Sequence, residues 1–423
     1  MSVDDRFSQG PLEDFDLGDL GRDVVAITGP VEDFATDFDH TDPVYAADPF
    51  PIWDELRERC PVAHTERYGG AWLPVRHEDV SAIAHDTERF SSRSPLMNNN
   101  RPPMDLAPMG IAPPISSDPP FHGDFRRVLL PPFAPKAIQA LEPSMVAYCD
   151  ELLDAMEGRD VVDAAVDYAQ HIPVRVITDM LGFPREDADQ HREFVHQLLE
   201  SVNVPMEERW GYIAGLITYL FERVQDHLAE PRDDLTTYLI EAELDGEPMP
   251  PETIMGAMAL LLLAGIDTTW SAIGASIWHL AGHPEDRERL VAEPELMPFA
   301  IEEFLRAYAP VTMARLVKED MEYAGCPMKA EDWVLLPFPA ANRDPEVFDR
   351  PDEVLIDRKA NRHSAFGLGV HRCLGSNLAR TELRIALERW LARYPDFSLA
   401  DPDAVRWSGG QVRGPRLLPI RVA

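Results

Sequence analysis

The residues most able to do chemistry lie in a glycine-rich segment at 366–375, which reads Phe-Gly-Leu-Gly-Val-His-Arg-Cys-Leu-Gly. A helix with apolar periodicity is predicted directly after the cysteine, over 374–393. Cys373 would therefore lie at a helix N-terminus, where the helix dipole and free N–H groups stabilise a thiolate. The three glycines let the backbone pass close to a flat, bulky group. A thiolate held in this way is a good axial ligand for haem iron. The alternative is an inert buried cysteine, the usual role of a lone Cys.

A second segment with chemical potential is Ala264-Gly265-Ile266-Asp267-Thr268-Thr269, in the middle of a helix predicted over 252–282. An acid beside an alcohol competes with the helix backbone for hydrogen bonds. Gly265 adds a cost of about 1 kcal/mol relative to alanine. Such an unfavourable sequence in a buried helix indicates a local distortion, which is often found at functional sites. A polar patch that faces another helix is the alternative.

Two further pairs have helical spacing. Glu303 and Arg306 share a face of a helix predicted over 296–308, and their spacing suits a bidentate ion pair. Taken alone the pair is a weak signal, since most such pairs are solvated surface contacts. His122 and Arg126 share a face at the start of another predicted helix. An ordinary histidine at a helix start is the alternative for His122.

The Phe-x-x-Gly-x-x-Arg-Cys-x-Gly pattern resembles the haem-binding loop of the cytochrome P-450 superfamily at every key position. Its chance probability in a chain of this length is on the order of one in 100,000 or less. The other three segments resemble further motifs of the same superfamily, in the expected order, and the resemblance covers roughly Asp42 to Ala423. It implies one triangular, mainly α domain with small β-sheets. Haem b would lie between the long central helix and the helix after Cys373.

The resemblance also implies a role for each segment. Cys373 would be the iron ligand. Asp267 and Thr268 would be the catalytic residues, in which Thr268 hydrogen-bonds the bound oxygen molecule and Asp267 relays protons from solvent. The residues that would tie down the coil behind the haem are Glu303, Arg306 and Arg358. The residues that would bind the cofactor are His122, Arg126, Ala264, Gly265, Arg315, Phe366, Gly367, His371 and Cys373, and His122, Arg126, Arg315 and His371 among them would bind the propionates.

The activity that the resemblance implies is hydroxylation, or O-dealkylation, of a small apolar substrate with O₂ and two externally supplied electrons. A terpenoid or a substituted aromatic is the expected substrate class. The chain has no GxGxxG motif after a strand and no iron–sulfur spacing. We therefore expect NAD(P)H-derived electrons to arrive through a ferredoxin or flavodoxin-type donor with its reductase. The arginines that could form a docking face, or could be propionate ligands or solvated charges, are Arg126, Arg127, Arg372 and Arg380.

The substrate pocket is expected to be lined by the apolar loop 91–117, the long helix and the segment 310–315. The candidate lining residues are Met97, Met104, Met109, Leu261, Val311 and Met313. Methionine adapts to irregular apolar ligands. The alternative is that these methionines only pack the loop.

The elements that must position these residues belong to a mainly helical chain with short strands near 312–324 and 333–337 and a hairpin-like C-terminal stretch. The formal net charge of −35 argues against nucleic-acid binding. Four widely separated cysteines form no disulfide scaffold or zinc motif. The segment 1–40 is predicted to be an acidic, loosely ordered tail, and 41–423 the catalytic domain. With no signal peptide and an apolar run at 255–265 too short for a membrane span, we expect a cytoplasmic protein without a membrane anchor.

Two other functions remain open from sequence. A non-catalytic haem sensor or carrier would have no use for an acid and an alcohol beside the iron. A peroxide-driven peroxygenase would usually lack that pair and use a carboxylate of the substrate. The pair Asp267–Thr268 therefore favours a monooxygenase over both.

Overall fold

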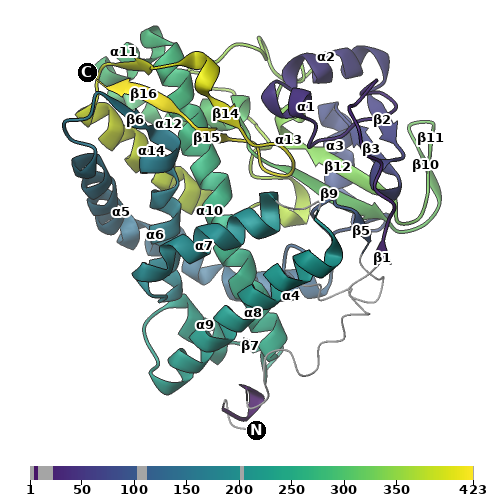
Figure 1. Ribbon diagram of the computed structural model, residues 1–423. Coiled ribbons are helices and arrows are strands. Elements are labelled where there is room, and N and C mark those ends of the chain that lie inside the picture. Colours follow the sequence, from purple (N-terminus) through teal and green to yellow (C-terminus); the bar gives the residue numbers. More distant parts are fainter. Residues whose placement is uncertain (1–3, 8–21, 102–111, 201–203, 423) are drawn as a thin grey trace.

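The computed structural model describes residues 4–7, 22–101, 112–200 and 204–422. Its helices pack around one long central helix, α10 (Pro251–Gly282), which contacts α6, α7, α8, α12 and α14 (Figure 1). The other helices are α1 (Pro43–Ala47), α2 (Phe50–Arg59), α3 (His77–His85), α4 (Phe121–Leu129), α5 (Pro135–Ala155), α6 (His171–Leu181), α7 (Ala188–Val195), α8 (Met206–Ala229), α9 (Leu235–Glu241), α11 (Pro284–Ala292), α12 (Met297–Ala307), α13 (Phe338–Ala341) and α14 (Ser376–Arg393).

The composition of α10 explains its central place. Among the described residues, α10 is the one helix whose length and apolar composition, taken alone, would allow it to cross a membrane. Most of its apolar side chains are instead buried against neighbouring helices. A helix that is apolar all round is typical of the core of a large domain as well as of a membrane. Here the packing accounts for it.

A five-stranded sheet lies apart from the main helical body, beside α1, α2 and α3 (Figure 1). Its strand order is β2-β3-β12-β9-β4, with β3 and β12 parallel and the other pairs antiparallel. The strands of this sheet are β2 (Val62–Thr65), β3 (Ala71–Pro74), β4 (Phe90–Ser91), β9 (Thr312–Val317) and β12 (Trp333–Pro337). Every residue of β12 is buried, as its unbroken apolar run Trp-Val-Leu-Leu-Pro requires. The strands predicted near 312–324 and 333–337 are confirmed.

The predicted hairpin-like C-terminal stretch forms two of the smaller sheets: β14 pairs with the next strand, β15, and β16 pairs with both β13 and β6. The remaining strands are β1 (Arg22–Asp23), β5 (Asn100–Arg101), β6 (Val161–Asp163), β7 (Glu243–Leu244), β8 (Glu247–Pro248), β10 (Met321–Tyr323), β11 (Cys326–Met328), β13 (Phe397–Leu399), β14 (Arg406–Trp407), β15 (Pro415–Leu417) and β16 (Pro419–Val422). A bridge between Val311 and Val412 brings the C-terminal loop against the start of β9.

The N-terminal boundary of the packed domain lies earlier than the predicted residue 40. Ala35 and Phe38 are buried in the core cluster that surrounds the five-stranded sheet. The guanidinium of Arg67 also binds Asp37 and the carbonyl of Ile27. Burial of a single phenylalanine inside an acidic stretch is hard to read from composition. Residues 8–21 of the predicted tail lie outside the described residues.

The expected distortion in the middle of the long helix is absent, since α10 continues without interruption through residues 264–269. The Thr268 hydroxyl donates to the carbonyl oxygen of Ala264 at 2.9 Å. This bond to the preceding turn satisfies the alcohol inside a regular helix.

Candidate active site: a cavity beneath Cys373

The loop before α14 is shaped by glycines in left-handed conformations. Gly367 and Gly369 have φ values of +71° and +69°, and a Cβ at Gly369 would lie 2.4 Å from the carbonyl oxygen of Ala84. Only glycine fits there without a shift of backbone. The N–H of Cys373 donates to the carbonyl of Phe366 at 2.7 Å, which closes the loop. The loop thus presents the sulfur just before α14 begins at Ser376.

Cys373 opens into a cavity between α10 and α14. Side chains of α4, α10, β9 and the cysteine loop line this cavity. The residues predicted from sequence that line it are His122, Arg126, Leu261, Ala264, Gly265, Thr268, Val311, Met313, Arg315, Phe366, Gly367, His371 and Cys373. The structure therefore brings together every residue expected to bind the cofactor.

The sulfur is accessible from the cavity but lies deep within the protein. Removal from bulk water raises the pKa of the Cys373 thiol. The N–H of Gly375 and the positive charges of Arg126, Arg372 and Arg380 act in the opposite direction. These donors and cations stabilise the thiolate, whereas burial opposes it until a positive partner binds at the sulfur.

One end of the cavity collects nitrogen donors from several segments of the chain. Among the described residues, the Nε2 atoms of His122 and His371 have no hydrogen-bond partner, and the two buried rings lie 4.2 Å apart. Burial and nearby arginines lower the pKa of His122 to about 4 and that of His371 to about 2. Burial lowers the pKa of Arg315 to about 10, although Asp118 partly offsets this effect.

This donor set fits haem b. Buried cations and unpaired N–H donors require an anionic partner, and haem presents two carboxylates at one edge. The thiolate and the close backbone approach at the glycine loop suit an iron ligand and a flat ring. Within the described residues, groups of acidic, histidine or cysteine side chains that could hold a bare metal ion are absent.

The two predicted catalytic residues lie on different sides of α10. Thr268 lines the cavity, whereas Asp267 is fully buried and points away from it. Asp267 Oδ1 accepts from Arg416 Nη2 at 2.5 Å, and its Oδ2 has no hydrogen-bond partner in the part of the chain that the structure describes. Burial raises the pKa of Asp267 to about 6 even though Arg416 lowers it. A carboxyl group with that pKa can take up and release protons near neutral pH.

The predicted structural tie is present behind the cysteine loop. Glu303 and Arg306 are both 0% exposed and form a bidentate pair, with bonds of 2.8 and 2.9 Å. Glu303 also accepts from Arg358 Nε at 2.9 Å and from Asn361 Nδ2 at 3.1 Å. Arg306 donates further to the carbonyls of residues 342, 351 and 353. The tie thereby fixes the coil between α13 and the cysteine loop to α12.

Comparison with known proteins agrees with this geometry. A family model described as cytochrome P450 matches residues 165–403, which is more than half of the chain. The polyketide biosynthesis cytochrome P450 PksS of Bacillus subtilis (strain 168) is 31% identical over 391 residues, which cover 89% of this chain and 96% of the relative.

The chain belongs to the cytochrome P450 family.

Other relatives agree with this assignment. The vitamin D(3) 25-hydroxylase of Pseudonocardia autotrophica is 34% identical and aligns with 83% of this chain and 88% of its own length. The crystal structure of CYP109E1 from Bacillus megaterium in complex with testosterone has a TM-score of 0.81 and 33% identity. The alignment covers 88% of this chain and 97% of the CYP109E1 chain. The protein is thus a cytochrome P450 monooxygenase, a haem-dependent oxidoreductase with a mainly helical fold.

Two polar residues of this P450 site, Arg416 and Glu382, belong to no sequence motif that would have identified them. Arg416 bridges Asp267 and Glu200, with a bond of 2.5 Å from its Nε to Glu200 Oε1. Glu382 on α14 lines the cavity, and burial raises its pKa to about 8 although a hydrogen bond to Thr269 lowers it. Their partners lie far away in sequence or on another helix. The sequence therefore offers no spacing signal for either residue.

The substrate-pocket prediction is wrong for one methionine. Met97 does not line the cavity but is fully buried in the core cluster around the five-stranded sheet. An apolar residue of this loop can pack either against the cavity or against the sheet, and Met97 packs against the sheet. Met104 and Met109 lie outside the described residues.

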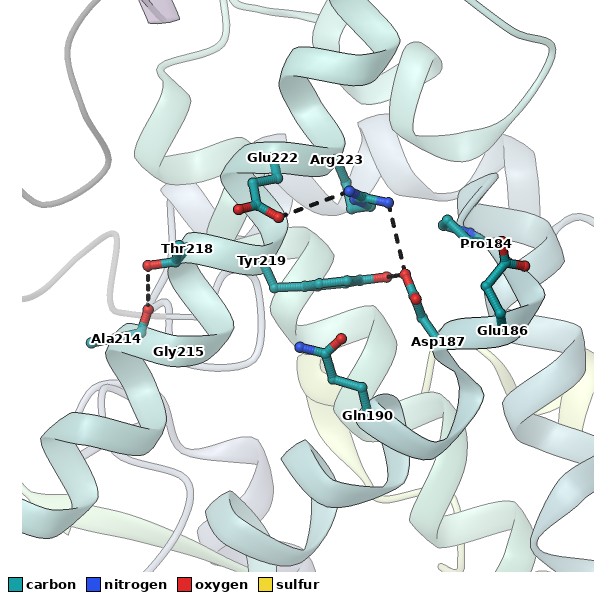
Figure 2. A pocket seen from close by; sticks show the side chains of 10 residues that line it. All are labelled: Pro184, Glu186, Asp187, Gln190, Ala214, Gly215, Thr218, Tyr219, Glu222 and Arg223. Atoms are coloured by element: carbon teal, nitrogen blue, oxygen red, sulfur yellow. Dashed lines mark hydrogen bonds and ion pairs between the residues drawn. The ribbon is translucent and has the colours of Figure 1, made fainter.

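A separate depression of about 620 Å³ lies between α8 and the start of α7 (Figure 2). Figure 2 shows Tyr219 at its centre, with the hydroxyl directed at Asp187. Arg223 approaches the same carboxylate at 3.7 Å. These charged groups already pair with one another, and the depression shares no lining residue with the cavity at Cys373.

Proposed function

We propose that the protein hydroxylates, or O-dealkylates, a small apolar molecule with O₂ and two electrons from an external donor. The observation that carries this proposal is the cavity itself, which holds Cys373 and Thr268 with Asp267 directly behind it. An acid and an alcohol at this place serve proton delivery, for which a haem sensor or carrier has no need. Hydroxylases and oxygenases among the relatives support the same reaction class.

Haem b, bound through the Cys373 thiolate, would supply the activation of O₂. The nitrogen donors of His122, His371, Arg126 and Arg315 would bind its propionates. The side chains that face away from the sulfur but line the same cavity would then exclude water and hold the substrate. In this arrangement the protein contributes ligand, orientation and proton supply.

Asp267 and Thr268 would move the protons that the reaction consumes. The Asp267 carboxyl can hold a proton at Oδ2, for which the described residues offer no hydrogen-bond partner. Because its pKa lies at about 6, both forms of the carboxyl are populated near neutral pH. Thr268 Oγ1 would exchange its bond to the Ala264 carbonyl for one to a group in the cavity.

The cavity wall favours an apolar substrate. Leu261, Val311 and Met313 line it, and the cavity surface is mostly apolar. Some relatives are named for mycinamicin IV, epothilone C/D or vitamin D(3). We propose a terpenoid or a substituted aromatic as the substrate class. Screening such compounds for the low-spin to high-spin shift of the bound haem tests this, and absence of a shift with any apolar compound would contradict it.

The electrons would come from NAD(P)H through a ferredoxin or flavodoxin-type protein and its reductase, in the cytoplasm. Arg372 is exposed in the cysteine loop and could contact an acidic donor, whereas the exposed Arg127 already pairs with Asp124 at 2.5 Å. Arg380 is less suited to this role, since Glu302 pairs with it. Reconstitution with each donor type, with product formation as the readout, tests this proposal. Equal turnover with peroxide and no electron donor would contradict it.

A further inference from the structure

Helix α12 carries two adjacent acids that bind different partners. Glu303 points at Arg306 and the coil behind the cysteine loop. Glu302, about 100° away around the helix, points instead at Arg380 of α14 and at His363. Only the first acid belongs to the structural tie described above. Glu302 therefore belongs to a separate group of contacts.

Glu302 and Arg380 form a fork-to-fork ion pair. Arg380 Nε and Nη2 donate to the two carboxylate oxygens at 2.5 and 2.8 Å. His363 Nε2 lies 3.1 Å from Glu302 Oε2, and the N–H of Ala365 donates to His363 Nδ1 at 3.2 Å. Hydrogen bonds from Arg380 and His363 outweigh burial and lower the pKa of Glu302 to about 2. The carboxylate is thus charged at every physiological pH, and it holds three segments together.

The Arg380 guanidinium lies over the face of the Phe366 ring, 4.4 Å from its centroid. Phe366 in turn accepts the N–H of Cys373 at its carbonyl. Arg380 therefore contacts the same loop residue that binds the backbone of Cys373. The positive charge of Arg380 thus lies beside the loop that carries the sulfur, held there by the Phe366 ring and by Glu302.

We infer that Glu302 and Arg380 are positioning residues for the cysteine ligand: Glu302 holds the Arg380 cation on the Phe366 ring, and that cation stabilises negative charge on the sulfur. The inference rests on the proposed function, in which Cys373 binds haem iron. It adds that the charge balance of this pair sets the electron donation from the sulfur. A cation close to the thiolate withdraws electron density and favours the reduced iron, whereas a nearby anion favours the oxidised iron.

Removal of each of the two charges should therefore shift the reduction potential of the bound haem in opposite directions. In the haem-loaded protein, Arg380→Met removes the cation and should move the reduction potential of the bound haem to more negative values. Glu302→Gln leaves the cation without its counter-charge and should move the potential to more positive values. Arg380→Lys keeps the charge and should stay closer to the unsubstituted protein than Arg380→Met does.

Matched controls come from the next turn of the same helix. Arg384 and Glu388 of α14 pair at 3.1 Å with exposures of 32% and 44%, and Arg384 also pairs with Glu142 at 2.7 Å. Arg384→Met and Glu388→Gln remove the same types of charge at a similar surface, away from Phe366. Spectroelectrochemical titration of all five variants should leave the potentials of these two controls unchanged.

Shifts of the same sign in Arg380→Met and Glu302→Gln, or shifts no larger than those of the controls, would overturn the inference. If Arg380→Met does not retain haem, Glu302→Gln and Arg380→Lys still decide the sign. The proposed function fails differently, because the unsubstituted protein itself would then lack the spectral signature of a thiolate ligand.

Discussion

Replacement of Glu303 by alanine removes the centre of a buried charge network. The Glu303 carboxylate accepts two bonds from Arg306 and one each from Arg358, Asn361 and the N–H of Leu355. Without it, the fully buried Arg306 guanidinium keeps only backbone carbonyls as partners. The coil that leads to the cysteine loop also loses its attachment to α12.

The expected loss is large. Removal of one partner from a buried ion pair costs about 3–5 kcal/mol, because the other charge stays buried and unpaired. This is a substantial share of a typical unfolding free energy of about 5–15 kcal/mol. It corresponds to about a hundredfold to five-thousandfold change in the folding equilibrium. Haem retention should fall with it, since the coil before the cysteine loop is no longer fixed.

The assay measures the haem-to-protein ratio after expression with excess haem precursor, together with the midpoint of urea unfolding. Glu353→Gln is the matched control, since Glu353 and Arg350 pair at 3.3 Å with exposures of 57% and 53%. Loss of that pair should cost less than about 1 kcal/mol. If Glu303→Ala retained full haem and unfolded within about 1 kcal/mol of the unsubstituted protein, the buried network would not have the structural role assigned to it.

Three further predictions concern protons and pH. Thr268→Ala should keep haem but release more of the consumed electrons as peroxide, and unchanged coupling of electron use to product would count against the proton-delivery role. Arg416→Leu should raise the pKa of Asp267 above about 6, because burial then acts without the opposing cation. The midpoint in the pH profile of coupled turnover should therefore move to higher pH. An unmoved midpoint would show that Asp267 does not set it. Glu302 has a lowered pKa in the folded state, so its stabilisation is present above about pH 4.3 and is lost as pH falls toward about 2; Glu302→Gln should flatten the unfolding free energy over that window, and a profile parallel to the unsubstituted protein would argue against the ion pair.

Much of the site follows from local sequence because its motifs are local. The helix predicted over 252–282 runs from Pro251 to Gly282 in the structure, so its predicted end is correct and its start differs by one residue. The helix predicted from 374 begins at Ser376, since Gly375 still belongs to the cysteine loop. The glycine pattern, the cysteine and the two helical pairs act through neighbours a few residues away. Such contacts leave a spacing that can be recognised.

The contacts that could not be predicted join distant segments. Arg416 comes from a C-terminal strand and binds two acids that lie about 150 and 216 positions away in the chain. Met97 could face either the cavity or the sheet, and only the packing of the core decides this. Phe38 and Ala35 are apolar residues in an acidic stretch, and their burial moves the domain boundary. In each case the deciding contact is tertiary.

The central claim is that ionised sulfur of Cys373 binds the iron of haem. The most direct measurement is the difference spectrum of the reduced protein with and without carbon monoxide, recorded for the unsubstituted chain and for Cys373→His. The account predicts the absorption band of a thiolate-ligated carbonyl complex in the former and its loss in the latter, with haem still bound. A folded, haem-loaded protein without that band, or with the same band after the substitution, would contradict it.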